Sequence, residues 1–209
     1  MKALILVDLQ NDFCNLGALA IKDGNEVISV ANMLMDKFDL VVATQDWHPA
    51  NHESFAAVHY FRRPGQVIDL HGLEQVLWTI HCVQETFGAE FVQELNIEKI
   101  TKIFPKGMDK TVDSYSGFYD NGRRSSTGLH NYLQSQGVTE VYIMGLALDY
   151  CVKFTAKDAI RLGYKTNLVV DGCRAVNLED GDGEKTVDFL KLLGVTVLES
   201  KDVLATELV

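Results

Sequence analysis

The sequence predicts an α/β fold: an open, mostly parallel sheet with helices on both faces, of the Rossmann-like type. Apolar runs of strand length alternate with stretches of helical periodicity, which is typical of such sheets. No linker and no shift in composition divides the 209 residues, of which 47% are hydrophobic. A chain of this length can bury one sizeable core, so we predict a single domain over residues 1–209.

The strands are predicted from six runs that are apolar almost throughout, as expected of strands buried on both faces. In chain order they are KALILV at 2–7, LVVAT at 40–44, KITKIF at 99–104, EVYIMG at 140–145, TNLVV at 166–170 and VTVLE at 195–199.

The helices are predicted from apolar residues three and four positions apart, which form one face of a helix. This spacing covers residues 27–38, 129–133, 152–160 and 187–193. Gly137, Gly163 and Gly194 follow three of these segments, at the position where glycine commonly ends a helix. The stretch at about 49–98 has no clear period, and we expect an irregular insertion that helps to wall the site.

Charge and cysteine usage exclude several kinds of partner. The net charge is −10 and acidic and basic residues are mixed, so no basic stripe predicts nucleic-acid binding. The first apolar run meets an aspartate at position 8 and is too short for a membrane span or a secretion signal. Four widely spaced cysteines without a CxxC pair suggest free thiols in a reducing compartment. We expect a cytoplasmic protein without nucleic-acid or membrane partners. The sequence does not decide whether the chain forms a homo-oligomer.

Two motifs predict a metal site. In DWHPANHESF, Asp46 and His48 are two residues apart and leave the same face of an extended chain; the motif also contains His52, and WTIHCV contains His81. Carboxylate and imidazole ligands without thiolate suit zinc or iron(II) at an open, reactive site. The alternative is a polar loop whose histidines cap turns or lie at the surface.

Reactive side chains also follow the predicted strands. In parallel sheets the ligand crevice lies beyond the carboxyl ends of the strands. That rule brings together Asp8, Asp46, His48, Lys106 and Cys151.

Cys151 is a candidate nucleophile because it lies at the start of a predicted helix, where the dipole and free N–H groups favour a thiolate. The backbone amides of Ala147 and Cys151 are candidate donors to an oxyanion. With Asp8 as base and Lys106 as cation, the set can support covalent catalysis. Each residue alone also has a structural reading: a packed thiol, a turn-capping aspartate or a solvated lysine. We interpret Cys14, Cys82 and Cys173 as small buried residues that pack in the core.

The motifs DLQNDF, DWHPxxHxSF, WTIHCV, FPKG, DSYSGF, GLALDYCV and DGCRAV occur in this order over nearly the whole chain. Together they resemble the nicotinamidases (pyrazinamidases) of the isochorismatase-like cysteine hydrolase superfamily. The resemblance implies the isochorismatase-like hydrolase fold, with Asp8, Lys106 and Cys151 as catalytic triad.

The same resemblance implies the other site residues. Asp46, His48 and His81 would hold one divalent metal ion, with zinc favoured and iron or manganese left open. His52 would be a further ligand or a residue beside the ligands, because members of the family differ there. Substrate contacts would come from Phe13, Trp78, Tyr115, Leu146 and Ala147, with a cis peptide bond between the last two; for Tyr115, core packing is an equal alternative.

We therefore expect an amide hydrolase that converts nicotinamide to nicotinate and ammonia through a thioester on Cys151, in NAD salvage, with the metal orienting the pyridine ring. We expect pyrazinamide to be accepted as well. One alternative is another amidase of the superfamily, such as one acting on N-carbamoyl compounds, which lacks the metal cluster. Others are a hydrolase whose metal activates water, and a binding module without catalysis.

Overall fold

The sheet has six strands, all parallel, in the order β5-β2-β1-β6-β7-β8. The computed structural model describes residues 1–205. The strands are β1 (Lys2–Val7), β2 (Val41–Asp46), β5 (Lys102–Lys106), β6 (Glu140–Leu146), β7 (Lys165–Arg174) and β8 (Thr196–Leu198). The predicted parallel sheet is confirmed.

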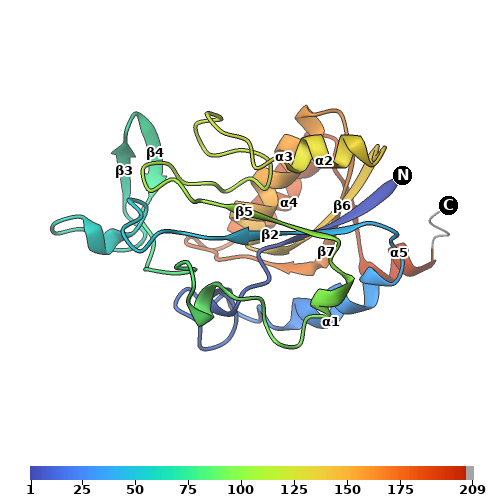
Figure 1. The fold of residues 1–209 in the computed structure, drawn as a ribbon, viewed down its shortest axis with the longest axis horizontal. Helices are drawn as coiled ribbons and strands as arrows, with labels where there is room; N and C mark the ends of the chain where they lie inside the picture. Colours follow the sequence, from blue (N-terminus) through green and yellow to red (C-terminus); the bar gives the residue numbers. More distant parts are fainter. Residues whose placement is uncertain (206–209) are drawn as a thin grey trace.

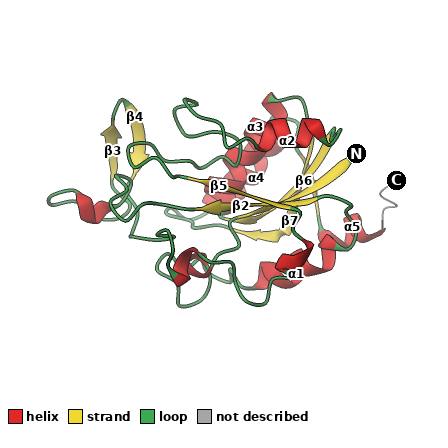
Figure 2. Cartoon of the chain, in the orientation of Figure 1, coloured by secondary structure: helices red, strands yellow, loops and turns green. Residues whose placement is uncertain are grey.

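Helices cover both faces of the sheet (Figures 1 and 2). One face carries α1 (Glu26–Met35) and α5 (Ser200–Ala205). The other carries α2 (Leu129–Ser135), α3 (Lys153–Arg161) and α4 (Asp182–Leu192). Four of these five helices were expected. The short α5 was not, because six residues hold too little of the helical period to be recognised.

The helix ends follow the predicted glycines, as α3 illustrates. Gly163 has a φ of 88°, a left-handed conformation that a side chain disfavours. Its N–H donates to the carbonyl of Ile160 (3.0 Å), and the next N–H, of Tyr164, donates to Ala159 (3.1 Å). These two bonds satisfy carbonyls that the ending helix would leave free.

The strand expected at 99–104 is displaced along the chain. Ile97–Lys99 forms a 3-10 helix, and β5 extends through Pro105 to Lys106. Proline is tolerated because β5 is an edge strand of the sheet. The displacement matters for the site, since Lys106 pairs in register with Asp46 at the ends of β5 and β2.

The stretch expected to be irregular contains a hairpin of two antiparallel strands, β3 (Val67–Leu70) and β4 (Leu73–Val76). It forms a separate two-stranded sheet at one end of the molecule (Figure 1). Its turn is His71 and Gly72, with φ values of 52° and 83°, as in the tight turns that join hairpin strands. Strands of four residues with mixed burial give too weak a sequence signal, so the hairpin was missed.

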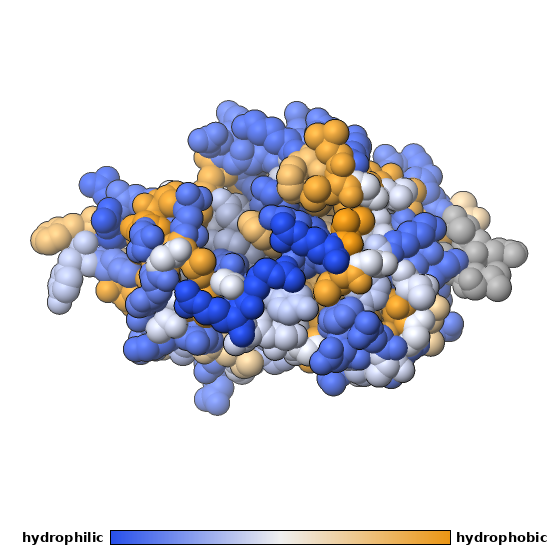
Figure 3. All heavy atoms as spheres, turned by 90° about the horizontal axis from the view of Figure 1, so that it is seen from above, coloured by the Kyte–Doolittle hydropathy of each residue, from blue (hydrophilic) through white to orange (hydrophobic). Residues whose placement is uncertain are grey.

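Hydrophilic residues cover most of the face shown in Figure 3, and apolar residues form separate patches on it. Within residues 1–205, no helix is long and apolar enough to cross a membrane.

Candidate active site

The carboxyl ends of the central strands meet at one rim of the sheet, as expected. Asp8 directly follows β1, and Asp46 and Lys106 are the last residues of β2 and β5. Cys151 lies in a π-helical turn, Leu148–Val152, between β6 and α3. Four segments that are far apart in sequence therefore bring their polar side chains together.

Lys106 lies at the centre of this group and is 2% exposed. Its Nζ donates to Asp46 Oδ1 (2.5 Å), to the carbonyl of Ser114 (2.9 Å) and to Cys151 Sγ (3.4 Å). It also lies 2.8 Å from Asp8 Oδ2, in ion-pair range but without hydrogen-bond geometry. Burial alone would lower the pKa of Lys106, but Asp46 and Asp8 outweigh it and raise the pKa well above its ordinary value. The ammonium is therefore a fixed positive charge beside the thiol.

Asp8 is fully buried, and its Oδ1 accepts a hydrogen bond from Thr44 Oγ1 (2.6 Å). Burial raises the pKa of Asp8 to about 6, against the attraction of Lys106 and with a further contribution from Asp46. Cys151 Sγ and one carboxylate oxygen from each aspartate lie within 4.8 Å of one another. An ionised Asp8 can thus receive the thiol proton at neutral pH.

Burial opposes the effect of the helix dipole on Cys151. The helix dipole favoured a thiolate, but burial raises the pKa of Cys151 well above its ordinary value despite Lys106. Burial therefore favours the protonated thiol, which needs a base to become a nucleophile. This makes the nearby carboxylate of Asp8 more important than the helix end.

Asp46, His48 and His81 form a group of ligand types whose donor atoms lie within 4.8 Å of one another. The Nε2 atoms of His48 and His81 lie 3.6 and 3.8 Å from Asp46 Oδ2. Both Nδ1 atoms donate to backbone carbonyls, of Gly107 and Thr79, each at 2.8 Å. Each Nδ1 therefore carries the hydrogen, and each Nε2 keeps a lone pair near Asp46 Oδ2. These residues fit a divalent ion.

His52 is also buried, and it differs from the other two histidines. Its Nδ1 lies 2.7 Å from the hydroxyl of Ser54, which can donate or accept, and 3.2 Å from the backbone N–H of the same residue. Nε2 has no hydrogen-bond partner within residues 1–205, and His52 belongs to a second group of ligand types with His48 and Asp113. This position is compatible with both expected places of His52, as a further ligand and beside the ligands.

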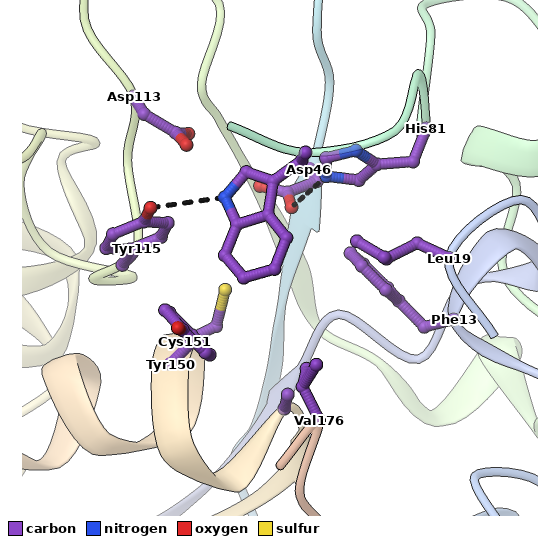
Figure 4. Close-up of a pocket in the computed structure, with 11 residues that line it drawn as sticks. Phe13, Leu19, Asp46, His81, Asp113, Tyr115, Tyr150, Cys151 and Val176 are labelled. Carbon is purple, nitrogen blue, oxygen red and sulfur yellow. Dashed lines mark hydrogen bonds and ion pairs between the residues drawn. The ribbon is translucent and has the colours of Figure 1, made fainter. Parts of the chain in front are cut away.

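A small cavity that opens to solvent lies next to these groups (Figure 4). Phe13, Leu19, Asp46, Trp78, His81, Asp113, Tyr115, Ala147, Tyr150, Cys151 and Val176 line it. Figure 4 shows Asp46 and His81 on one side of the cavity and Cys151 on another.

Four of the five predicted substrate-contact residues line this cavity: Phe13, Trp78, Tyr115 and Ala147. Leu146 does not; its side chain is fully buried in the core. The peptide bond between Leu146 and Ala147 is cis, as expected. The predicted Asp46, His81 and Cys151 also line the cavity. Leu19, Asp113, Tyr150 and Val176 were not predicted, although Tyr150 precedes Cys151 and Asp113 begins the DSYSGF motif, so position alone could have suggested these two.

Hydrogen bonds within the turn at Leu148–Val152 reduce the number of backbone N–H groups that can donate to an oxyanion. The N–H groups of Tyr150 and Val152 donate to the carbonyl of Ala147 at 3.1 and 3.0 Å. Both amides are engaged and are poor donors to a substrate. The amide of Cys151 lies between them in sequence and, with that of Ala147, remains the candidate.

Two polar residues that sequence reasoning missed, the buried Gln10 and the half-buried Asp12, hold the site in place. Gln10 binds the backbone of Asp46 twice, accepting its N–H and donating to its carbonyl, each at 2.8 Å. Asp12 Oδ2 accepts the backbone N–H of Cys82 (2.7 Å), the neighbour of His81. Both belong to DLQNDF, so the motif supports the metal ligands as well as supplying Asp8.

A thiol, an ammonium and a carboxylate gathered at the rim of a parallel sheet define a candidate site of a cysteine-dependent α/β hydrolase. Residues 2–202 match the isochorismatase domain model, and the chain belongs to the isochorismatase family.

Relatives match over nearly the whole chain. The nicotinamidase of Escherichia coli (strain K12) is 47% identical over 207 residues, which cover 96% of each chain. The structure of a nicotinamidase and pyrazinamidase from Acinetobacter baumanii has a TM-score of 0.94 at 42% identity, covering 97% of each chain. A Pyrococcus horikoshii pyrazinamidase in complex with zinc has a TM-score of 0.77 at 35% identity, covering 95% of this chain and 98% of that one.

Proposed function

We propose that the protein is a nicotinamidase, which hydrolyses nicotinamide to nicotinate and ammonia. The observation that carries the proposal is the 3.4 Å contact between Cys151 Sγ and the Lys106 ammonium, at a cavity lined by aromatic rings. Asp8 Oδ2 lies 2.8 Å from the same ammonium, and a carboxylate oxygen of Asp8 lies within 4.8 Å of Cys151 Sγ. The nicotinamidases that this chain resembles over nearly its whole length support the choice of substrate.

In the proposed mechanism, Asp8 removes the proton from Cys151, and Lys106 stabilises the resulting thiolate. The sulfur attacks the carboxamide carbon, and the amides of Ala147 and Cys151 receive the oxyanion. Protonated Asp8 then gives its proton to the departing nitrogen, which releases ammonia and leaves a thioester. Asp8 next deprotonates a water molecule, which cleaves the thioester to nicotinate and returns the thiol.

Asp46, His48 and His81 would hold the metal ion, and zinc is our choice, supported by the zinc complex of the Pyrococcus pyrazinamidase. When bound, the ion supplies an open Lewis-acid position that suits a pyridine nitrogen. The aromatic walls then orient the ring so that its carboxamide faces Cys151. Iron and manganese accept the same ligand types.

We further propose that pyrazinamide is a substrate, because it presents a carboxamide on a similar ring. Four free, buried cysteines suit a reducing compartment, so we place the reaction in the cytoplasm.

Steady-state release of ammonia from nicotinamide tests the proposal, with Cys151→Ala beside the wild type. We expect the variant to lose nearly all turnover, and rapid quenching of the wild type to give a protein mass increased by the nicotinoyl group. A variant that keeps most of its turnover would favour metal-activated water. Absence of ammonia from a wild type with its metal bound would favour a binding module.

A further inference from the structure

The β3–β4 hairpin carries one buried polar side chain, Gln75, that hydrogen-bonds residues in the wall of the cavity. Gln75 lies on β4, outside the main sheet, and is 2% exposed. It does not itself line the cavity. A buried carboxamide is costly unless its hydrogen-bonding groups are satisfied, so the contacts of Gln75 indicate what it supports.

Gln75 Nε2 lies within hydrogen-bond distance of three acceptors: the carbonyl of Val76 (2.8 Å), Asp113 Oδ2 (3.0 Å) and Tyr115 Oη (3.0 Å). Its two hydrogens are therefore shared among three oxygens. Two of these oxygens belong to residues that line the cavity. The hairpin is thus tied to the loop that carries Asp113 and Tyr115.

Tyr115 Oη receives a second hydrogen bond, from Trp78 Nε1 (3.1 Å). A tyrosine oxygen accepts two hydrogen bonds at most, so Gln75 and Trp78 together use its acceptor capacity and fix the ring. Burial and the nearby Asp113 raise the pKa of Tyr115 well above its ordinary value, so the hydroxyl stays neutral.

The rings of Trp78 and Tyr115 also contact Tyr150, the residue before Cys151. Trp78 packs edge-on against Tyr150, with ring centroids 4.7 Å apart, and Tyr115 lies 5.4 Å from Tyr150. The three rings form one wall of the cavity, and Gln75 holds this wall from behind.

We propose that Gln75 is a positioning residue that sets the spacing of the Trp78 and Tyr115 rings and thereby governs the binding of a planar aromatic amide. The inference rests on the proposed function for its substrate. It assigns Gln75 to substrate binding and not to the chemical step, because the side chain of Gln75 hydrogen-bonds Val76, Asp113 and Tyr115, and none of these is in the proposed catalytic triad.

The test is Gln75→Leu, which keeps the bulk of the side chain and removes its donors. Losing a buried hydrogen bond should raise the KM for nicotinamide about tenfold. We expect kcat to change less than about threefold, since the reacting groups keep their places. The indole N–H resonance of Trp78, assigned with Trp78→Phe, should shift in a ¹⁵N-labelled sample.

Two further variants keep the test sharp. Tyr115→Phe removes the shared acceptor without changing Gln75; it should also shift the Trp78 resonance, and it should add little to the effect of Gln75→Leu in the double variant. Asn32→Leu is the control: it removes a carboxamide that binds Glu94 and Asn96 beside α1, away from the cavity, and should change neither readout.

An unchanged KM with an unmoved Trp78 resonance in folded Gln75→Leu would overturn the inference, as would an equal response in Asn32→Leu. If Gln75→Leu fails to fold, a Trp78 resonance unmoved in Tyr115→Phe overturns it. A wild type that does not hydrolyse nicotinamide would refute the proposed function, while the Trp78 resonance would still decide the role of Gln75.

Discussion

The hydroxyl of Thr44 donates a 2.6 Å hydrogen bond to Oδ1 of Asp8. Both side chains are fully buried; Thr44 lies on β2, and Asp8 directly follows the neighbouring strand β1. This bond leaves Oδ2 of Asp8 facing Lys106. A strand residue without an obvious chemical role therefore fixes which oxygen of the proposed base is available.

The first prediction concerns the acid limb of the pH profile. Burial raises the pKa of Asp8 to about 6, and the base must be ionised to accept the thiol proton. Below pH 6 we expect kcat/KM to fall about tenfold per pH unit. The pKa of Asp46 is lowered and that of Lys106 is raised, so neither should titrate near pH 6. A profile flat down to pH 4.5 would contradict the assignment of Asp8 as base.

Thr44→Val should move this limb. The hydroxyl of Thr44 lowers the pKa of Asp8, so its removal should raise that pKa and shift the acid limb to higher pH. Activity at pH 6 should fall, while activity well above the limb should recover much of its value. Thr44→Ser keeps a hydroxyl and serves as the control. Coincident pH profiles for Thr44→Val and wild type would show that the hydrogen bond does not act on the base.

Lys106→Met should lower turnover by at least about a hundredfold, because the thiolate and Asp8 both lose their stabilising charge. Lys106 Nζ also donates to Oδ1 of Asp46, a proposed metal ligand, so the metal content of the variant must be measured as well. We expect the metal to stay, since the variant keeps Asp46, His48 and His81 and removes a positive charge beside them. Turnover and elemental analysis on one preparation measure both effects. Loss of metal would mean that Lys106 orients Asp46 for the ion.

Gly107→Ala should abolish metal binding at Asp46, His48 and His81. The φ of Gly107 is 66°, and an added Cβ would lie 2.4 Å from Cε1 of His48. The ring would have to turn, and its Nδ1 would lose the Gly107 carbonyl. Gly65→Ala is a matched control, with a φ of 84° and nothing within 4 Å of the added carbon. Both variants should lose about 1 kcal/mol or more to backbone strain. Elemental analysis should find the metal missing only from Gly107→Ala, and equal metal content in both would contradict the prediction.

Chelation followed by dialysis should suppress the hydrolysis of nicotinamide, and adding back a divalent ion should restore it. The expectation follows from the paired Nε2 atoms of His48 and His81, which lie within 4 Å of Asp46 Oδ2. Ammonia release measures activity, and elemental analysis confirms removal. Normal turnover by protein free of metal would show that the ion does not orient the substrate.

The sequence predicted the parts of the fold that depend on local pattern. Buried strands and amphipathic helices have distinct periods, and the glycines that end the helices adopt the left-handed conformation for which glycine is suited. The hairpin of β3 and β4 and the short α5 escaped prediction because their segments are too short to show a period. The predicted bounds of β5 were wrong for a different reason. The residues at which this strand begins and ends are decided by its pairing with β2 and not by local composition.

The residue types in the sequence motifs predicted the reactive groups: Asp8, Lys106 and Cys151, with Asp46, His48 and His81 beside them. Their chemistry is a property of the side chains, so the sequence alone could name it. How these groups act on one another was decided only by the tertiary structure. Burial sets the pKa of Asp8 and Cys151, and backbone carbonyls select the tautomers of the histidines. Gln10, Thr44 and Gln75 carry no reactive group, and their roles arise from partners distant in sequence, because hydrogen bonds across strands and loops exist only once the chain has folded.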